Sequence, residues 1–264
     1  MYLCKTFHEV ENGVVHTINA VLNPSTNTLP KQIEDQGFFH IMSEALKATG
    51  YEDKLQGYKD ETYTDGDLTA PSIYGDKLVP YPANRYLGYT AFLEPDALLF
   101  EHGINNFEDL AKKCAEWYPE ADASAPYTSP TNPVNQFVGY HLVDRKLPYS
   151  RLVCYRITTE YFDSEKDFQS NSDRHEYYET MAGRLIKVTM PRSNPKYSTS
   201  ILINYSRNTE ATVDEYMNVV VNNPTTFVED SLYANFVGEA LNGTIHTIEK
   251  ILLYDENVMA GRVL

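Results

Sequence analysis

Apolar side chains recur every three to four residues at several places in the first half of the chain. In the clearest run, 38–49, Phe, Ile, Met, Ala and Leu fall on one side of a helix. Gly50 follows directly, and glycine is the usual residue at a left-handed C-terminal cap. The pattern predicts an amphipathic helix over 38–49, preceded by a strand-like run at 13–22 and a polar connector over 27–36.

Two further helices are predicted from the residues that begin them. Asn105, with Glu108 three positions later, has the pattern of a capping box and precedes an apolar stripe that ends at Trp117. Asn132 followed by Pro133 combines a preferred N-cap residue with the residue favoured at the first helical position.

Strand patterns dominate the second half of the chain. Short runs rich in β-branched and aromatic residues alternate with polar or proline-containing stretches. One acidic, helix-compatible stretch, 160–180, interrupts them. The predicted strands are 86–93, ahead of this half, and 151–158, 185–190, 200–205, 218–221, 225–228 and 244–253 within it. Helices followed by strands, without regular alternation, predict an α+β fold rather than a doubly wound sheet.

The stretch 56–86 lacks any periodicity and is punctuated by glycine and proline. A structureless loop of this length is uncommon in a compact domain, so we expect an elaborated surface insertion. Tyrosine is frequent in the chain, at 21 of 264 residues, and its ring with a polar tip suits wet interfaces and sugar-stacking surfaces. Candidate binding residues in the insertion are Tyr58, Tyr63, Tyr74 and Tyr81.

Charge and composition exclude several kinds of partner. The 37 acidic residues outnumber the 22 basic ones and give a net charge of −15, the wrong sign for nucleic acid or an anionic membrane surface. No apolar run approaches the roughly 20 residues of a membrane span. The 3 cysteines lie far apart, without a zinc signature or a disulfide framework, so neither a metal nor a cofactor is predicted.

The sequence contains no motif of the serine hydrolases, nucleotide-binding proteins or metalloproteases. The densest acidic stretches, 65–67 and 163–167, do not follow calcium-loop spacing and are interpreted as solvated loops. Asp96, after a strand and a proline, is expected to accept backbone N–H bonds at a helix start. A carboxylate pair for glycoside hydrolysis is the catalytic alternative that stays open.

A self-comparison of the chain finds an internal repeat. Residues 12–22, NGVVHTINAVL, align with residues 242–252, NGTIHTIEKIL, at six identical positions of eleven. In both copies Asn-Gly suits a tight turn that leads into a strand. His246 is expected to satisfy buried backbone groups, because no second histidine lies at metal-ligand spacing. One copy near each end predicts a tandem array in which 1–26 is the terminal strand and linker of a preceding copy.

These residues resemble the fasciclin family. The second copy of the repeat is similar to the closing box N-G-x-I-H-x-I-x-x-x-L, and residues 90–100, TAFLEPDALLF, resemble the opening box T-x-F-A-P-T-D-x-A-F. Tyr140 and His141 fall where the family has a Tyr-His pair, and the helix over 38–49 resembles its leading helix. The sequence departs from the pattern at 93–95, where Leu-Glu-Pro replaces the usual Ala-Pro-Thr.

The resemblance implies a fasciclin-like domain over 31–254, with helices followed by a β-rich wedge or sandwich of two small sheets. Insertions are expected at 56–86 and 144–184, and 255–264 is expected to be a linker towards a following domain. Tyr140 and His141 would be the family's suspected interaction spot, unless Tyr140 anchors helix to sheet and His141 is buried. The structural motif residues would be Thr90, Phe92, Asp96, Asn242, Gly243 and His246.

The implied function is that of a non-catalytic adhesion or protein-interaction module in a tandem, exported protein of the bacterial cell surface. The expected partners are adjacent fasciclin-like domains of the same chain and other surface proteins or polysaccharide. A membrane would be reached only through an anchor in the parent protein, which would also carry the signal sequence that these residues lack. The alternative function is surface glycan binding through the Tyr-rich stretch 56–89.

Overall fold

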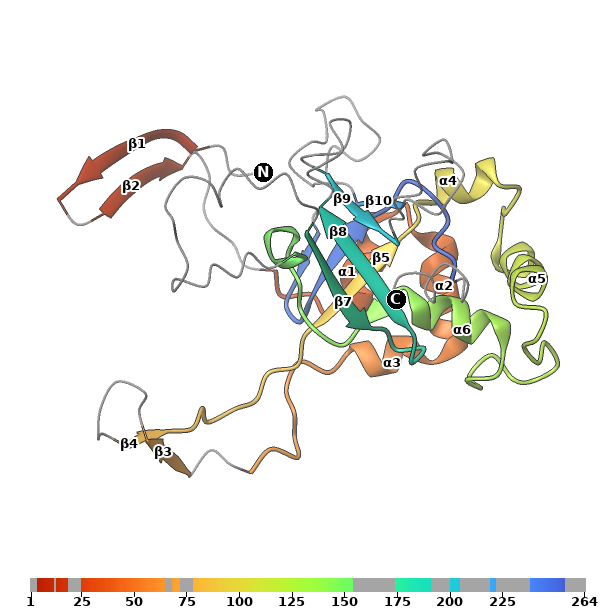
Figure 1. Cartoon of the computed structure of the whole chain (residues 1–264), viewed down its shortest axis with the longest axis horizontal. Helices are drawn as coiled ribbons and strands as arrows, with labels where there is room; N and C mark the ends of the chain where they lie inside the picture. Colours follow the sequence, from red (N-terminus) through yellow and green to blue (C-terminus); the bar gives the residue numbers. More distant parts are fainter. Residues whose placement is uncertain are drawn as a thin grey trace.

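The computed structural model describes residues 4–11, 13–18, 25–64, 68–71, 78–153, 174–190, 200–204, 219–221 and 238–254. Helices α2, α5 and α6 gather beside the central strands (Figure 1). None of the described helices is long and apolar enough to cross a membrane. The helices are α1 (Leu29–Gln36), α2 (His40–Thr49), α3 (Tyr51–Leu55), α4 (Asp96–Glu101), α5 (Phe107–Trp117), α6 (Pro133–Tyr140) and the short 3-10 helix Tyr149–Arg151.

Helix α1 occupies the stretch for which the sequence predicts a polar connector, so that prediction is wrong. Pro30 lies in the first turn of α1, where the missing N–H of proline costs no helical hydrogen bond. Gly37 ends the helix with a φ of 73°. Leu29 and Ile33 are buried. Lys31, Glu34 and Asp35 are exposed and form the outer face of a short amphipathic helix rather than a connector.

Helix α2 confirms the leading helix expected over 38–49, although its first helical residue is His40. Met42, Ala45 and Leu46 face the core with at most 2% exposure. Gly50 ends α2 with a φ of 75°, in the left-handed conformation that the sequence predicts.

The two helix starts predicted from asparagine residues differ in outcome. Asn132 caps α6 as expected, because its Oδ1 accepts the N–H of Val134 at 2.9 Å. The cap of α5 is Asn106, whose Oδ1 accepts the N–H of Asp109 at 2.9 Å, so the prediction for Asn105 is wrong by one residue. The two asparagines are equally good caps on local grounds. Burial of Phe107 places the start of the helix directly after the second of them.

Most of the described strands form two four-stranded sheets, of order β11-β12-β5-β6 and β10-β9-β8-β7. In the first sheet β12 runs parallel to β5, and every pair in the second sheet is antiparallel. The strands are β5 (Tyr89–Leu93), β6 (Leu142–Val143), β7 (Arg174–Glu179), β8 (Leu185–Met190), β9 (Ile201–Ile203), β10 (Val219–Val221), β11 (Glu239–Ala240) and β12 (Gly243–Thr247). Helices and two small sheets confirm the α+β class.

The two sheets approach each other where Val143 of β6 forms an antiparallel bridge with Thr180, the residue after β7. Two hydrophobic clusters fill the interior. One lies among the helices and β5, and includes Leu46 and Phe137. The other includes Phe92 and residues of β8 and β9. The two sheets are thus joined by this bridge and by the second cluster, to which both sheets contribute side chains.

Several strand predictions need correction. Residues 151–153 of the predicted strand 151–158 are the end of the 3-10 helix and a bend. Residues 154–158 and the predicted strand 225–228 lie outside the described residues. The described end of the helix-compatible stretch 160–180 is strand β7. Strand β12 ends at Thr247 rather than at residue 253. It ends there because β5, its parallel partner, also ends, at Leu93.

The first copy of the repeat lies in a separate hairpin of β1 (Cys4–Val10) and β2 (Gly13–Ile18). We expect this segment either to pack against the main domain or to add a strand to it. The second expectation is wrong for the described residues, because β2 pairs with β1 in a sheet of their own. Figure 1 shows this hairpin standing away from the body of the molecule, so the described strands do not pack against the main domain either.

The described residues of the stretch 56–86 lie on the surface of the molecule. The two ends of the stretch meet at an antiparallel bridge between Lys59 and Tyr86. Between them, β3 (Thr69–Pro71) and β4 (Leu78–Pro80) form a short antiparallel ladder that extends away from the body (Figure 1). The three residues of β4 are exposed. Of the second expected insertion, 144–184, the residues 154–173 lie outside the described residues.

Candidate functional site

Asn242, in the turn between β11 and β12, joins three elements of the domain. Its Oδ1 accepts the N–H of Leu29 at the start of α1, at 2.8 Å. Its Nδ2 donates to the carbonyl oxygens of Leu55, at 2.8 Å, and Gly57, at 2.6 Å. The side chain is only 2% exposed. The closing motif therefore uses this amide to fasten the ends of α1 and α3 to the sheet.

Gly243 follows at the first position of β12. A Cβ atom here would lie 3.0 Å from both the Leu29 side chain and the carbonyl oxygen of Tyr89. Glycine is required at this position because the backbone of β12 passes so close to α1 and β5.

His246 lies in the middle of β12 and is buried. Its Nε2 is 2.8 Å from the carbonyl oxygen of Leu147 and donates to it, and its ring stacks on Phe92 at 5.4 Å between centroids. Burial lowers the pKa of His246 to about 4, so the ring is neutral at pH 7. The structure thus places this histidine on a backbone group, as the sequence predicts.

The opening motif makes the matching contacts on β5. Thr90 donates from Oγ1 to the carbonyl oxygen of Arg145 at 2.6 Å and accepts the N–H of Leu147 at 2.9 Å. Phe92 is fully buried. This strand therefore fixes the course of the chain that leaves β6.

Asp96 accepts backbone N–H groups at a helix start, but the helix is a distant one. Its carboxylate accepts the N–H of His40 at 2.9 Å and that of Ile41 at 3.1 Å. These groups belong to the first turn of α2, whereas Asp96 itself begins α4. The expected chemistry is present, and it ties the opening motif to the leading helix.

Tyr140 and His141 lie at 0% exposure, so the expected interaction spot is not on the surface. The Tyr140 hydroxyl donates to the carbonyl oxygen of Leu185 at 3.1 Å and accepts from Nδ2 of Asn204 at 2.9 Å. It joins α6 to β8 and to the end of β9. This is the anchoring role that the sequence left open as the alternative to binding.

His141 pairs with an acid that the sequence analysis did not select. Its Nδ1 donates to the carbonyl oxygen of Phe137 at 2.7 Å, and its Nε2 lies 2.9 Å from Oε1 of Glu94. The same Oε1 accepts the N–H of Leu252 at 2.9 Å, and both side chains are fully buried. Glu94 could have been selected because it is one of the positions at which the sequence departs from the fasciclin pattern.

No family model matches the chain. In sequence it is 35% identical over 115 residues to the transforming growth factor-beta-induced protein ig-h3 of Sus scrofa, and 32% identical over 117 residues to that of Oryctolagus cuniculus. Each match covers 43% of this chain and 15% of the relative, so the chain spans a small part of the length of these proteins. Protein ig-h3 is a fasciclin-domain protein. Over these residues the chain is similar to a fasciclin-domain protein.

Among solved structures, this fasciclin-like chain is similar to a FAS1 domain pair from the insect cell adhesion molecule fasciclin I. The TM-score is 0.40 and the sequence identity 17%, over 95% of this chain and 59% of that chain.

The four tyrosines expected to bind differ in their exposure. Tyr58 is 49% exposed and Tyr81 43% exposed. Tyr63 is half-buried, with the guanidinium of Arg85 at 5.6 Å from its ring centroid. Tyr74 lies outside the described residues. Two of the four candidates therefore present a large part of their surface on the insertion of the fasciclin-like domain.

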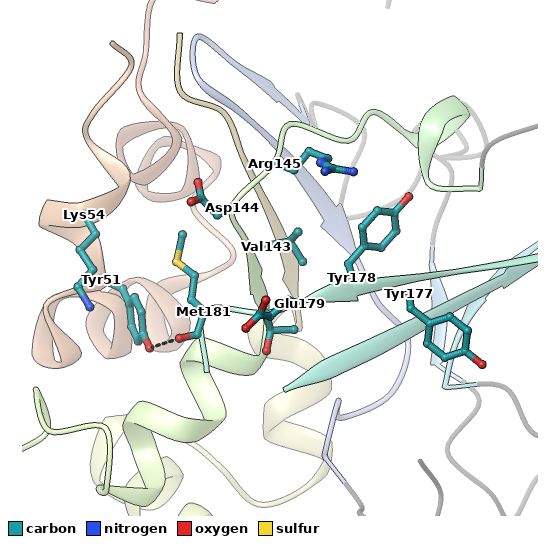
Figure 2. A pocket seen from close by; sticks show the side chains of 10 residues that line it. Tyr51, Lys54, Val143, Asp144, Arg145, Tyr177, Tyr178, Glu179 and Met181 are labelled. Atoms are coloured by element: carbon teal, nitrogen blue, oxygen red, sulfur yellow. Dashed lines mark hydrogen bonds between the residues drawn. The ribbon is translucent and has the colours of Figure 1, made fainter. Parts of the chain in front are cut away.

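A cleft of about 610 Å³ lies elsewhere, between α3 and the ends of β6 and β7 (Figure 2). Its charged side chains are Lys54, Asp144, Arg145 and Glu179. They come from three separate segments, so no spacing in the sequence could have identified them as a group. In the described part of the chain, no cluster of three or more histidine, cysteine or acidic side chains could hold a metal ion.

Proposed function

We propose that the chain is a non-catalytic adhesion or protein-interaction module. The observation that carries this proposal is the set of hydrogen bonds that the motif residues make within the domain. Thr90, Asp96, Tyr140 and Asn242 all use their hydrogen-bonding groups to tie together distant segments of the domain. Such a motif builds a scaffold and leaves its surface to a partner. Fasciclin domains are generally cell adhesion modules, which agrees with this use.

The same similarity supports a setting outside the cell. Fasciclin-domain relatives are extracellular or secreted adhesion proteins. We infer that this chain works at the cell surface of a bacterium, as part of an exported parent protein. Its partners there would be other surface proteins, reached through the exposed loops and sheet edges of the domain.

A tandem arrangement is supported by the two hairpins that carry the repeat. Residue Val10 pairs with Gly13 in the first hairpin, and Ala240 pairs with Gly243 in the second, so the register at the Asn-Gly turn is the same. In the second hairpin, β12 pairs on its other edge with β5. We infer that β2 is the closing strand of a preceding fasciclin-like domain and would take the equivalent of β5 as its partner.

An adhesion assay tests the main proposal. Beads coated with the full chain should bind to cells or cell envelopes of the source organism in a saturable manner, and soluble chain should compete. Beads coated with heat-unfolded chain are the control, because they carry the same charge without the fold. Failure of the soluble chain to compete at a hundredfold excess would show that the binding is unspecific and remove the proposal.

The alternative function, glycan binding through 56–89, is favoured by the exposed rings of Tyr58, Tyr81 and Tyr86, the last at 70% exposure. Alanine at Tyr81 and Tyr86 should abolish binding to a glycan array if these rings stack on sugars. Alanine at Tyr127, exposed at 41% on a distant loop, is the matched control. Retention of glycan binding in the Tyr81 and Tyr86 variant would exclude the insertion as the sugar site.

A further inference from the structure

Strand β7 lies at the edge of the second sheet and, among the described residues, is paired along its length only with β8. An edge strand has one row of backbone N–H and C=O groups without a ladder partner. Bonded and non-bonded pairs alternate along an antiparallel ladder, and this alternation shows which residues contribute the unpaired N–H and C=O groups.

Two observations settle the alternation. Lys187, which lies opposite Tyr177, uses its backbone on the other side: its carbonyl accepts the N–H of Asn204 at 2.7 Å, and its N–H donates to Oδ1 of Asn204 at 3.2 Å. The N–H of Thr180 donates towards β8, to the carbonyl oxygen of Arg184 at 2.9 Å. Tyr177 therefore turns its own N–H and C=O away from β8. His175, two residues earlier, does the same.

The cleft of about 610 Å³ lies along this edge. One wall is 177–181, and the opposite wall is 143–145, which separates from β7 beyond the bridge between Val143 and Thr180. The separation is fixed, because Thr90 holds the N–H of Leu147 and draws that segment back towards β5. Figure 2 shows the two backbone segments diverging around the cleft.

The side chains around the cleft add charges of both signs. The side chains of Asp144, Arg145 and Glu179 are exposed and have no hydrogen-bond or ion-pair partner among the described residues. Across the cleft, Lys54 lies over the ring of Tyr51 at 4.6 Å from its centroid. These two acidic and two basic side chains suit a ligand in which hydrogen-bond donors and acceptors alternate. They do not select strongly for a ligand of either net charge.

We propose that the outer edge of β7 accepts an extended segment of another polypeptide as an added strand, with its side chains beside the cleft. The proposal rests on the proposed function as a protein-interaction module and names the surface that it uses. An extended peptide is the ligand whose backbone repeats N–H and C=O groups at the spacing of a strand edge. The sequence of β7, RHEYYE, contains no proline or glycine to block pairing, and its charges oppose indiscriminate edge-to-edge aggregation.

Hydrogen exchange of the full chain tests the open edge without any ligand. The amides of His175 and Tyr177 should exchange on the order of a hundred times faster than those of Glu176, Tyr178 and Thr180, which face β8. Equal protection of the two sets would show that the edge is already covered and would overturn the proposal.

Binding is tested with peptides selected on the full chain from a phage-displayed library of random nonapeptides. Tyr177→Pro removes one outward N–H and leaves the ladder to β8 intact, since proline is tolerated on an edge strand. It should weaken a selected peptide about tenfold or more. Tyr177→Ala keeps the N–H and should change the affinity less than about threefold. Melting curves check that both variants are folded, and His175→Pro is the second edge variant.

Each other outcome has a definite meaning. Loss of peptide binding in Tyr177→Ala to the same extent as in Tyr177→Pro would indicate recognition by the ring, as for a sugar, and overturn strand addition. Dimerisation that Tyr177→Pro abolishes, with no peptide selected, would replace another polypeptide by a second copy of this chain. Normal bead adhesion by Tyr177→Pro, with peptide binding lost, would retain the adhesion function and place it on another surface.

Discussion

Replacing Asn242 by alanine is the sharpest test of the scaffold. The substitution leaves three backbone groups without their partner: the N–H of Leu29 and the carbonyl oxygens of Leu55 and Gly57. An unsatisfied buried polar group costs about 1–3 kcal/mol. The carbonyl of Gly57 is only part-buried and can turn to water. We therefore expect a loss of about 3–5 kcal/mol, a large share of the roughly 5–15 kcal/mol that stabilises a typical domain.

Urea denaturation followed by circular dichroism measures this loss. Asn105→Ala is the matched control, because that side chain is exposed and its contacts are long, 3.4 Å to the carbonyl oxygen of Gly103 and 3.5 Å to Asp109. It should cost less than about 0.5 kcal/mol. A loss below about 1 kcal/mol for Asn242→Ala would refute the interpretation of Asn242 as the fastening residue.

Asn242→Asp tests the donor of the amide separately from its acceptor. The acceptor for the Leu29 N–H stays, but the donor becomes a second acceptor that faces the carbonyls of Leu55 and Gly57. At pH 7 this variant should be at least as unstable as the alanine variant, because a buried carboxylate then lies against two carbonyl oxygens. Equal stability of Asn242→Asp and the native chain would contradict the assigned orientation of the amide.

Four further outcomes are expected. Tyr140→Phe removes a hydroxyl with two partners and should lower the free energy of unfolding by about 1–2 kcal/mol, measured by urea titration. Gly243→Ala should cost about 2 kcal/mol or more, since its Cβ would lie 3.0 Å from the Leu29 side chain and from Tyr89 O; an unchanged melting temperature would contradict the close approach. The pKa of His246 is lowered to about 4 in the fold, so the unfolded state binds the proton first and stability falls as the pH drops from about 6.5 towards 4, by about 3 kcal/mol. His246→Leu should be less sensitive over this range, and parallel pH profiles of the two proteins would count against burial of a neutral ring. Removal of 1–26 should shift the melting temperature by less than about 2 °C, because its described strands pair only with each other; a larger drop would make the hairpin part of this domain.

Local patterns were sufficient where a few adjacent residues decide the structure. The helix over 38–49 and its glycine cap, the start of α6 at Asn132 and the strand over 185–190 all follow from periodicity or capping chemistry. The α+β class follows from the order of such elements. Where two adjacent residues were equal candidates, as at Asn105 and Asn106, burial of Phe107 in the folded domain made the choice.

Long-range partners were beyond the reach of these patterns. The polar stretch 27–36 becomes α1 because its Leu29 and Ile33 have a core to enter, and β12 stops at Thr247 because its partner β5 stops. Glu94 and His141 lie 47 residues apart in the chain, yet they form one buried pair. The closing and opening motifs carry the resemblance to fasciclin domains in the sequence alone, but their physical roles appear only when α1, α3, β5 and β12 are assembled.

The sequence by itself determined the α+β class, the main amphipathic helix, the repeat of the Asn-Gly motif and the resemblance to fasciclin domains. Each of these depends on adjacent residues or on an ordered set of short motifs. Only the tertiary structure decided that Tyr140 and His141 are buried anchors, that Asp96 caps α2, and that β7 leaves an open edge beside a charged cleft. These properties depend on which groups from distant segments satisfy one another, and that is settled by packing in three dimensions.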